Sequence, residues 1–199
     1  MAPERRRLVG VFGRALLLLP VFLVAWWFAS AALGRLAGSV AQWGVAAAAG
    51  PSRLASDGAA LHYEISIASR RDPLRDAGAV ADLEVKSGTY TFGIALFLAL
   101  ALAAPESRRP GRIAAGVAIL VLLPAWGVAF DVLRQLGVTE SLGPMLGWGG
   151  GFRNFVALGY QAGSLLLPTL GPIVAWMALN PAAWRSAERE PEEMARTAR

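Results

Sequence analysis

The chain contains no cysteine and only one histidine in 199 residues. The absence of cysteine excludes disulfides, thiolate nucleophiles and cysteine-ligated metals, and a single His62 excludes a multi-histidine metal site within one chain. The sequence also has no HExxH motif, no Ser/His/Asp grouping and no paired aspartates inside its apolar segments. We therefore predict no catalytic residue, no metal site and no cofactor, and we expect that the protein is not an enzyme.

Charge is scarce as well, because only 17% of the residues are charged and 55% are hydrophobic, with a mean hydropathy of +0.47. The apolar residues fall into blocks that approach the ~20 residues needed to cross a bilayer. This predicts an α-helical integral membrane protein. The net charge is +5, but most of the arginines flank the apolar runs. Membrane lipid is thus the expected partner of these charges, and nucleic acid is not.

Four segments have the character of membrane-spanning helices, namely 15–33, 89–104, 113–136 and 155–179. The first could instead be a signal peptide, because Ala29-Ser30-Ala31 resembles a cleavage site. Its length, Trp26 and Trp27, and the further apolar segments behind it favour an uncleaved helix. We therefore expect about four transmembrane helices.

Residues 34–50 form an amphipathic segment. One helical face holds Leu33, Leu36, Val40, Trp43 and Ala47. The segment is predicted either to extend the first helix or to lie as a short helix on the outer membrane surface.

Residues 51–88 form a polar insert between the first two helices. In "LHYEISI" and in "DLEVK", apolar and polar residues alternate, which is typical of half-buried strands. The polar stretch "SRRDPLRDAG" between them predicts a β-hairpin. A lone hairpin is marginal in water, so its apolar face should pack on the amphipathic segment, on the last outer loop or on another protein.

The arginines predict the orientation. The residues near the ends that would share one side are Arg5, Arg6, Arg7, Arg14, Arg108, Arg109, Arg112, Arg185 and Arg189. The positive-inside rule then places the basic tail 1–14, the loop 105–112 and the tail 180–199 in the cytoplasm. The insert 51–88 and the Gly-rich loop 137–154 would face the periplasm, across a bacterial inner membrane.

Two charged residues, Asp131 and Arg134, lie one turn apart at the end of the third helix. Asp131 follows Ile113 by ~27 Å of helix, which places it at the outer interface. The two side chains form either an interfacial ion pair that sets the depth of the helix or, with Gln135, polar contacts to a neighbouring helix or partner.

The fourth helix contains Gly159 and Gly163 in a GxxxG pattern, which allows two helices to approach closely. This face packs either within the monomer or on a partner helix, and homo-oligomerisation stays open. Tyr160 and Gln161 lie at a depth similar to that of Asp131. A polar cluster of Asp131, Arg134, Gln135, Tyr160 and Gln161 is therefore geometrically allowed.

Prolines interrupt the last two predicted helices. Pro124 lies in the third, and Pro168 and Pro172 lie in the fourth. Each is predicted to kink its helix, since proline frees a backbone carbonyl. The alternative is a broken helix that lines a transport path. The sequence shows neither an inverted repeat nor a charge at the bilayer centre.

Three stretches, "TYTFGIALFLALALAAP", "LLPAWGVAFDVLRQL" and "ALGYQAGSLLLPTLGPIVAWMALN", resemble the exosortase H-associated membrane proteins. The resemblance implies association with exosortase H, a membrane transpeptidase-like enzyme that acts on proteins with C-terminal sorting signals in Gram-negative envelopes. Exosortases are thought to use a cysteine with arginine and histidine. A chain without cysteine is therefore expected to be an accessory or scaffold protein, with an exosortase or a sorting-signal protein as its partner. The alternative is a small transporter or channel subunit.

Overall fold

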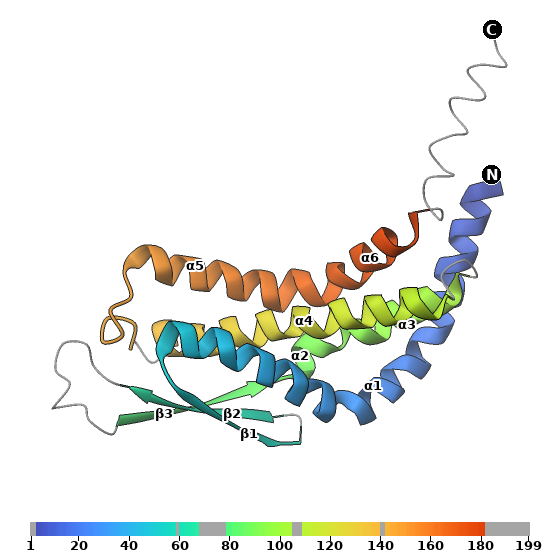
Figure 1. The fold of residues 1–199 in the computed structure, drawn as a ribbon. Helices are drawn as coiled ribbons and strands as arrows, with labels where there is room; N and C mark the ends of the chain where they lie inside the picture. The colour runs from blue at the N-terminus through green and yellow to red at the C-terminus, as the bar shows by residue number, and fades with distance from the viewer. Residues whose placement is uncertain (1–2, 59, 68–78, 105–108, 140–141, 182–199) are drawn as a thin grey trace, which may run out of the picture.

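The computed structural model describes residues 3–58, 60–67, 79–104, 109–139 and 142–181. Most of them are helical, and three strands form one small antiparallel sheet (Figure 1). Three helical stretches are long and apolar enough to cross a membrane, namely Val9–Ala49, Pro110–Val138 and Gly150–Leu179. The sheet lies near one end of the bundle, called here the sheet end. Helix α1 begins and helix α6 finishes at the other, called the termini end.

Helix α1, Pro3–Ala49, is a single helix of 47 residues, which corresponds to a length of ~70 Å. It includes both the predicted span 15–33 and the amphipathic segment 34–50 almost to its end. Of the two interpretations of that segment, the extension of the first helix is therefore correct. Pro20 lies inside the helix, which bends along its length (Figure 1).

The second half of α1 packs through its small residues. Ala37, Ala41 and Val45 are buried, whereas Val40 and Trp43 point outward, Trp43 with 82% of its surface exposed. The apolar face identified in the sequence is thus the outer face of the helix. Small side chains allow a neighbouring element to approach the helix backbone, so they determine which face packs.

The sheet consists of β1 (Ser52–Asp57), β2 (Ala60–Ile67) and β3 (Ala79–Lys86), in the order β1-β2-β3. Strands β2 and β3 are the two predicted strands, and they pair antiparallel. The prediction of a two-stranded hairpin was wrong in its strand count, because β1 adds a third. Gly58 has a φ of 59°, which glycine adopts without strain at the turn into β2. The predicted connection within 68–78 lies outside the described residues.

The apolar face of the sheet packs on the helices. Leu61, Tyr63 and Ile65 are fully buried in a core, the sheet-end core, that also contains residues of α1 and α4. The Tyr63 hydroxyl donates a hydrogen bond to the Gly38 carbonyl of α1 at 2.8 Å. Burial raises the pKa of Tyr63 above its ordinary value, so this hydroxyl remains a donor. The amphipathic segment is therefore one of the elements that the insert packs on, as predicted.

After the sheet, the chain forms α2 (Gly88–Thr91), α3 (Gly93–Ala103) and α4 (Pro110–Arg134), which continues as the π-helix η2 (Gln135–Thr139). The predicted segment 89–104 is thus two short helices separated at Phe92. Helix α3 lies in the interior of the bundle, with Phe97 and Ala99 almost fully buried. A helix enclosed by other helices does not have to match the thickness of the lipid, which explains why so apolar a helix is so short.

The last helical stretch comprises α5 (Gly150–Gln161), the π-helix η3 (Ala162–Leu166) and α6 (Leu167–Leu179). It begins five residues before the predicted start at 155, because Gly150 and Gly151 are helical. Helices α1 and α4 run toward the sheet end, and α2–α3 and α5–α6 return (Figure 1). At the termini end, Arg112 of α4 donates a hydrogen bond to the Asn180 side chain at 3.3 Å.

Candidate functional site

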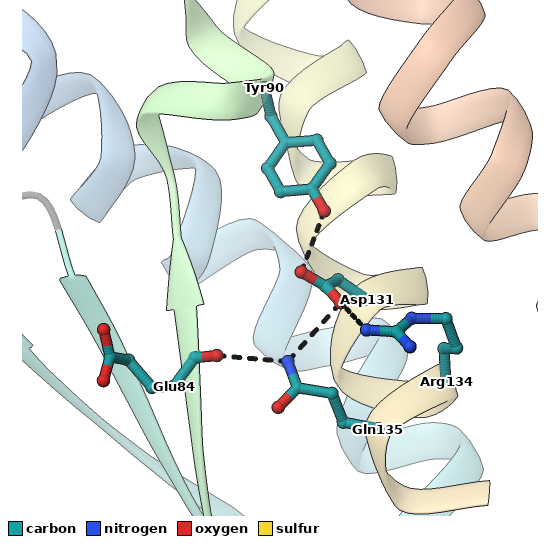
Figure 2. Close-up of polar contacts among 5 residues, drawn as sticks. All are labelled: Glu84, Tyr90, Asp131, Arg134 and Gln135. Atoms are coloured by element: carbon teal, nitrogen blue, oxygen red, sulfur yellow. Dashed lines mark hydrogen bonds and ion pairs between the residues drawn. The ribbon is translucent and has the colours of Figure 1, made fainter. Parts of the chain in front are cut away.

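Asp131 lies in the last turn of α4, where the sheet meets the helices. Both of its carboxylate oxygens accept hydrogen bonds (Figure 2). The Tyr90 hydroxyl donates to Oδ2 at 2.8 Å, and Arg134 Nη2 donates to Oδ1 at 3.1 Å. The Arg134 contact is the i, i+3 ion pair that the sequence predicts. The carboxylate therefore joins α2 to α4.

Tyr90 reaches Asp131 because α4 has a glycine one turn earlier. A Cβ atom at Gly127 would overlap the Tyr90 ring. Tyr90 itself is only 4% exposed, so its ring fills the space between α2 and α4. A buried hydroxyl needs a hydrogen-bond partner, and Asp131 provides one. Gly127 and Asp131 thus position Tyr90 together.

Gln135 extends the contacts to the sheet. Its Nε2 donates to the backbone carbonyl of Glu84 on β3 at 3.1 Å, and it lies 3.4 Å from Asp131 Oδ1. Figure 2 shows the Glu84 carboxylate pointing away from these contacts. Gln135 is the first residue of η2, and π-helical turns are often found where a side chain has a specific role. The amide therefore connects β3 to α4.

Arg134 connects the cluster to the fourth helical stretch. Its guanidinium carbon lies 4.4 Å from the centre of the Tyr160 ring of α5, which is a cation–π contact. The side chains of Asp131 and Arg134 are 14% and 31% exposed. We call Tyr90, Asp131, Arg134, Gln135 and Tyr160 the polar junction. It links β3, α2, α4 and α5 where the bundle meets the sheet.

The structure brings together four of the five residues of the predicted cluster. Gln161 is exposed and lies outside the polar junction. Sequence analysis missed Tyr90, which comes from a segment that looks uniformly apolar. The available signal was the aspartate itself, because a carboxylate withdrawn from water needs donors, and Tyr90 has one of the few hydroxyl groups nearby in the apolar segments.

Helix α4 of the same chain packs against both glycines of the GxxxG pattern. A Cβ atom at Gly159 would overlap the Phe130 ring, and one at Gly163 would lie 2.7 Å from Gly127 Cα. Trp126 Nε1 also donates to the Gly159 carbonyl at 3.2 Å. Of the two alternatives, packing within the monomer is the one that the geometry supports, and this face is not open to a partner helix.

The prolines also lie in packed surroundings. Pro124, Pro168 and Pro172 are buried. A Cβ atom at Gly93 of α3 would lie 2.6 Å from the Pro168 carbonyl oxygen, so α3 and α6 touch there. The Thr169 hydroxyl donates to the Leu165 carbonyl at 2.7 Å, in the turn that the prolines interrupt. The contacts favour a packing role over the lining of a transport path.

The chemistry of the polar junction is that of a structural connection. The carboxylate is neutralised by Arg134 and bonded by Tyr90, and Gln135 is used by the sheet. Within the described ranges, no three histidine, aspartate or glutamate side chains lie close enough together to hold a metal ion. The site is therefore suited to fixing the sheet on the bundle.

Long apolar helices with a small sheet at one end define a class, the helical membrane proteins with a compact β insert. Within this class, the chain belongs to the exosortase H-associated membrane protein family, whose model matches residues 5–183. No match was found among curated proteins or among solved structures. The family assignment expected from the three sequence stretches is confirmed.

Proposed function

We propose that the chain is a non-catalytic accessory or scaffold protein of an exosortase H system in the bacterial cell envelope. The observation that supports this proposal is the family match over residues 5–183, because the description of the family names an association with exosortase H. The polar junction adds support, since its groups are used to hold the chain's own elements together. The proposed partners are the exosortase and a sorting-signal protein.

The membrane position that we propose follows from the charges on two helices. Arg14 and Arg35 of α1 bound a stretch without charge that is ~30 Å long. Arg112 and Asp131 bound a similar stretch of α4, about 28 Å long. Both lengths match the hydrocarbon core of a bilayer. The sheet and residues 36–49 of α1 then lie outside the membrane.

The orientation that we propose places both termini in the cytoplasm and the sheet in the periplasm. The arginines of the tails and of the loop 105–112 support it, because positive residues accumulate on the cytoplasmic side. A sheet with open edges cannot face hydrocarbon, since its unpaired backbone groups need water or a partner. A position of the sheet at the outer surface meets both requirements.

In this arrangement the chain crosses the inner membrane four times. Helices α1, α4 and α5–α6 supply three long passes. The pass through α2 and α3, Gly88–Ala103, is shorter. Because α3 is enclosed by the other helices, it does not need to match the thickness of the lipid around it.

The scaffold role is supported by how firmly the sheet is fixed. Tyr63 bonds to Gly38 of α1, and Gln135 bonds to β3. Gln42 Nε2 donates to the Ser52 carbonyl of β1 at 2.6 Å. Each strand therefore has a side-chain bond to a helix, in addition to the sheet-end core. A platform held this way can present a surface at a fixed height above the membrane.

The test of the proposed function is physical association in the native membrane. The tagged chain, isolated from its own host in a gentle detergent, is expected to retain the exosortase, as measured by mass spectrometry. A helical membrane protein of similar size with the same tag serves as the control. Recovery of the exosortase at the level of that control, with the tagged chain intact, would contradict the proposal.

A further inference from the structure

Both edges of the sheet have backbone groups that point away from the neighbouring strand. Ser66 N donates to the Pro51 carbonyl at 3.4 Å, so Pro51 and every second residue after it direct their backbone groups toward β2. Ser52, Leu54 and Ser56 therefore direct theirs away from the sheet. The bond from Gln42 to the Ser52 carbonyl agrees with this assignment.

The outer edge of β3 is partly closed. By the same alternation, Glu84 directs its carbonyl outward, and Gln135 of η2 bonds to it. On β1, Gln42 bonds the outward carbonyl of Ser52, at the end of the strand away from Asp57, but no bond from the described part of the chain reaches the outward N–H and C=O groups of Leu54 and Ser56. Figure 1 shows β1 at the margin of the molecule, on the side away from α5. An open edge of this kind is a template for another strand.

Helix α1 forms a wall beside the open edge. Gly38 faces the sheet, because a Cβ atom there would lie 2.9 Å from Leu61 and 3.2 Å from Leu54. Gly44 faces α4 at Ala129. With 100° per residue, the flank of α1 on the side away from α4 holds Ser39, and Trp43 lies further round the helix, away from the sheet. A strand added to β1 would thus have this flank of α1 on its inner side.

The open edge begins near the proposed membrane surface. Gln42 lies beside Ser52 and Gly38 lies beside Leu54, so β1 runs antiparallel to the outer half of α1. The Asp57 end of β1 is therefore the end nearest to Arg35, where the charge-free stretch of α1 stops. Six residues of strand then rise ~20 Å from that level.

We propose that β1 receives, as an added fourth strand, the extended segment directly outside the membrane helix of a protein presented to the exosortase. This inference rests on the proposed accessory function. A segment that leaves the bilayer beside Arg35 meets the β1 edge at once, with the flank of α1 as its wall. Strand addition bonds the backbone and tolerates many side chains, which suits a class of membrane-anchored substrates better than one dedicated partner.

The exposed face of β1 adds a preference in charge. Arg53 lies at the end of the strand far from the membrane, and Asp57 lies at the end near it. An acidic side chain on the outer part of the bound segment would face Arg53, and a basic one close to the membrane would face Asp57. Cross-strand pairs of opposite charge stabilise a sheet, so this order of charges is the favoured one.

Two proline variants distinguish the two edges. Ser56→Pro removes an outward N–H of β1, whereas Val80→Pro removes an outward N–H of β3. Neither residue donates its N–H to β2, so both variants keep the pairs within the sheet. Circular dichroism and thermal unfolding in detergent would verify that both variants fold.

The experiment uses the full chain in its native membrane, with a photoreactive amino acid at Ala55 on the exposed face of β1. We expect cross-links to residues close to the membrane helix of a second, membrane-anchored protein, identified by peptide mass spectrometry. Ser56→Pro should lower their yield about five- to ten-fold, and Val80→Pro should leave it unchanged.

Cross-links that join Ala55 only to another copy of this chain, or to segments far from any membrane helix, would overturn the proposal. An equal loss in Val80→Pro, or no loss in Ser56→Pro, would overturn it as well. Retention of the exosortase without these cross-links would reject the strand addition alone. Absence of the exosortase from the native isolation would reject the proposed function, so the two failures can be told apart.

Discussion

Asp131 is bonded by three other residues of the polar junction, namely Tyr90 of α2, Arg134 of α4 and Gln135 of η2. Replacing it by alanine would remove the acceptor of the buried Tyr90 hydroxyl and of Arg134 Nη2. We expect a loss of about 2 kcal/mol in the free energy of unfolding, because unsatisfied polar groups are costly when buried. Reversible denaturant unfolding in detergent measures this change. Gln161→Ala, at an exposed residue outside the junction, is the matched control with no expected effect.

The same residues permit a test of coupling. Tyr90→Phe removes only the hydroxyl that bonds Asp131, and it is expected to cost about 1 kcal/mol. In the variant Asp131→Ala, the further change Tyr90→Phe should cost much less, since its partner is already absent. Additive losses in this double-mutant cycle would contradict the hydrogen bond between them.

Gly163 tests the packing of the fourth helical stretch. Gly163→Ala would place a Cβ atom 2.7 Å from Gly127 Cα on α4, so we expect a clear loss of thermal stability, with about 1–3 kcal/mol as the scale for an overpacked contact. Gly151→Ala, in α5 of the same helical stretch, meets nothing within 4 Å. That control should be neutral or slightly stabilising, since alanine favours a helix. Equal melting temperatures for the two variants would argue against the close approach of the helices.

This contact also limits what Gly163 can reveal about partners. Gly163→Leu is a natural test of a GxxxG contact to a partner helix, but a large side chain there would separate η3 from α4 of the same chain. Loss of a complex in that variant would report on folding. The cross-link from β1 is therefore the better probe of a partner.

Among the elements, the outer half of α1 provides the sharpest comparison. Ala41 is 3% exposed and contributes to the sheet-end core, whereas Ala47 is exposed on the same helix. Ala41→Leu should destabilise the protein by about 1–3 kcal/mol through overpacking. Ala47→Leu makes the same chemical change and should have little effect. Thermal unfolding of the two variants in detergent measures the difference, and a reversed order would contradict the assigned face.

The strands show how far the sequence could predict the elements. β2 was found because Leu61, Tyr63 and Ile65 alternate with polar residues, and β3 was found in the same way. β1 was missed because "SRLASD" is mostly small and polar, so its strand conformation depends on pairing with β2 rather than on its own pattern. The Asp57-Gly58 pair was the available signal, since Asp-Gly is typical of tight hairpin turns.

The packing of α1 and of the polar junction was harder to predict for a physical reason. The stripe with Val40 and Trp43 did not indicate the buried face, because the small residues on the opposite face, such as Ala41, allow neighbouring elements to approach the helix backbone. Tyr90 and Asp131 are far apart in the sequence and meet only in the folded chain. Their contact therefore could not be predicted from the residues around either of them. Asp131 and Arg134 could be paired from their spacing alone.

For the whole molecule, the absence of cysteine gives direct access to orientation. Single cysteines can be introduced at Ala55 on β1 and at Arg109 at the termini end, and both residues are exposed. We expect a membrane-impermeant maleimide to label Ala55→Cys from the periplasm of intact inner membranes. Arg109→Cys should react only after the inner membrane is opened. The opposite pattern of labelling would reverse the proposed topology.

The central claim is that the chain supports an exosortase without performing the catalysis itself. The most direct measurement is the processed fraction of a sorting-signal protein in host cells that retain the exosortase but lack this chain. We predict that the unprocessed precursor accumulates, and that the wild-type chain restores processing when it is supplied again. Unchanged processing in its absence, with the exosortase present at its normal level, would contradict the account.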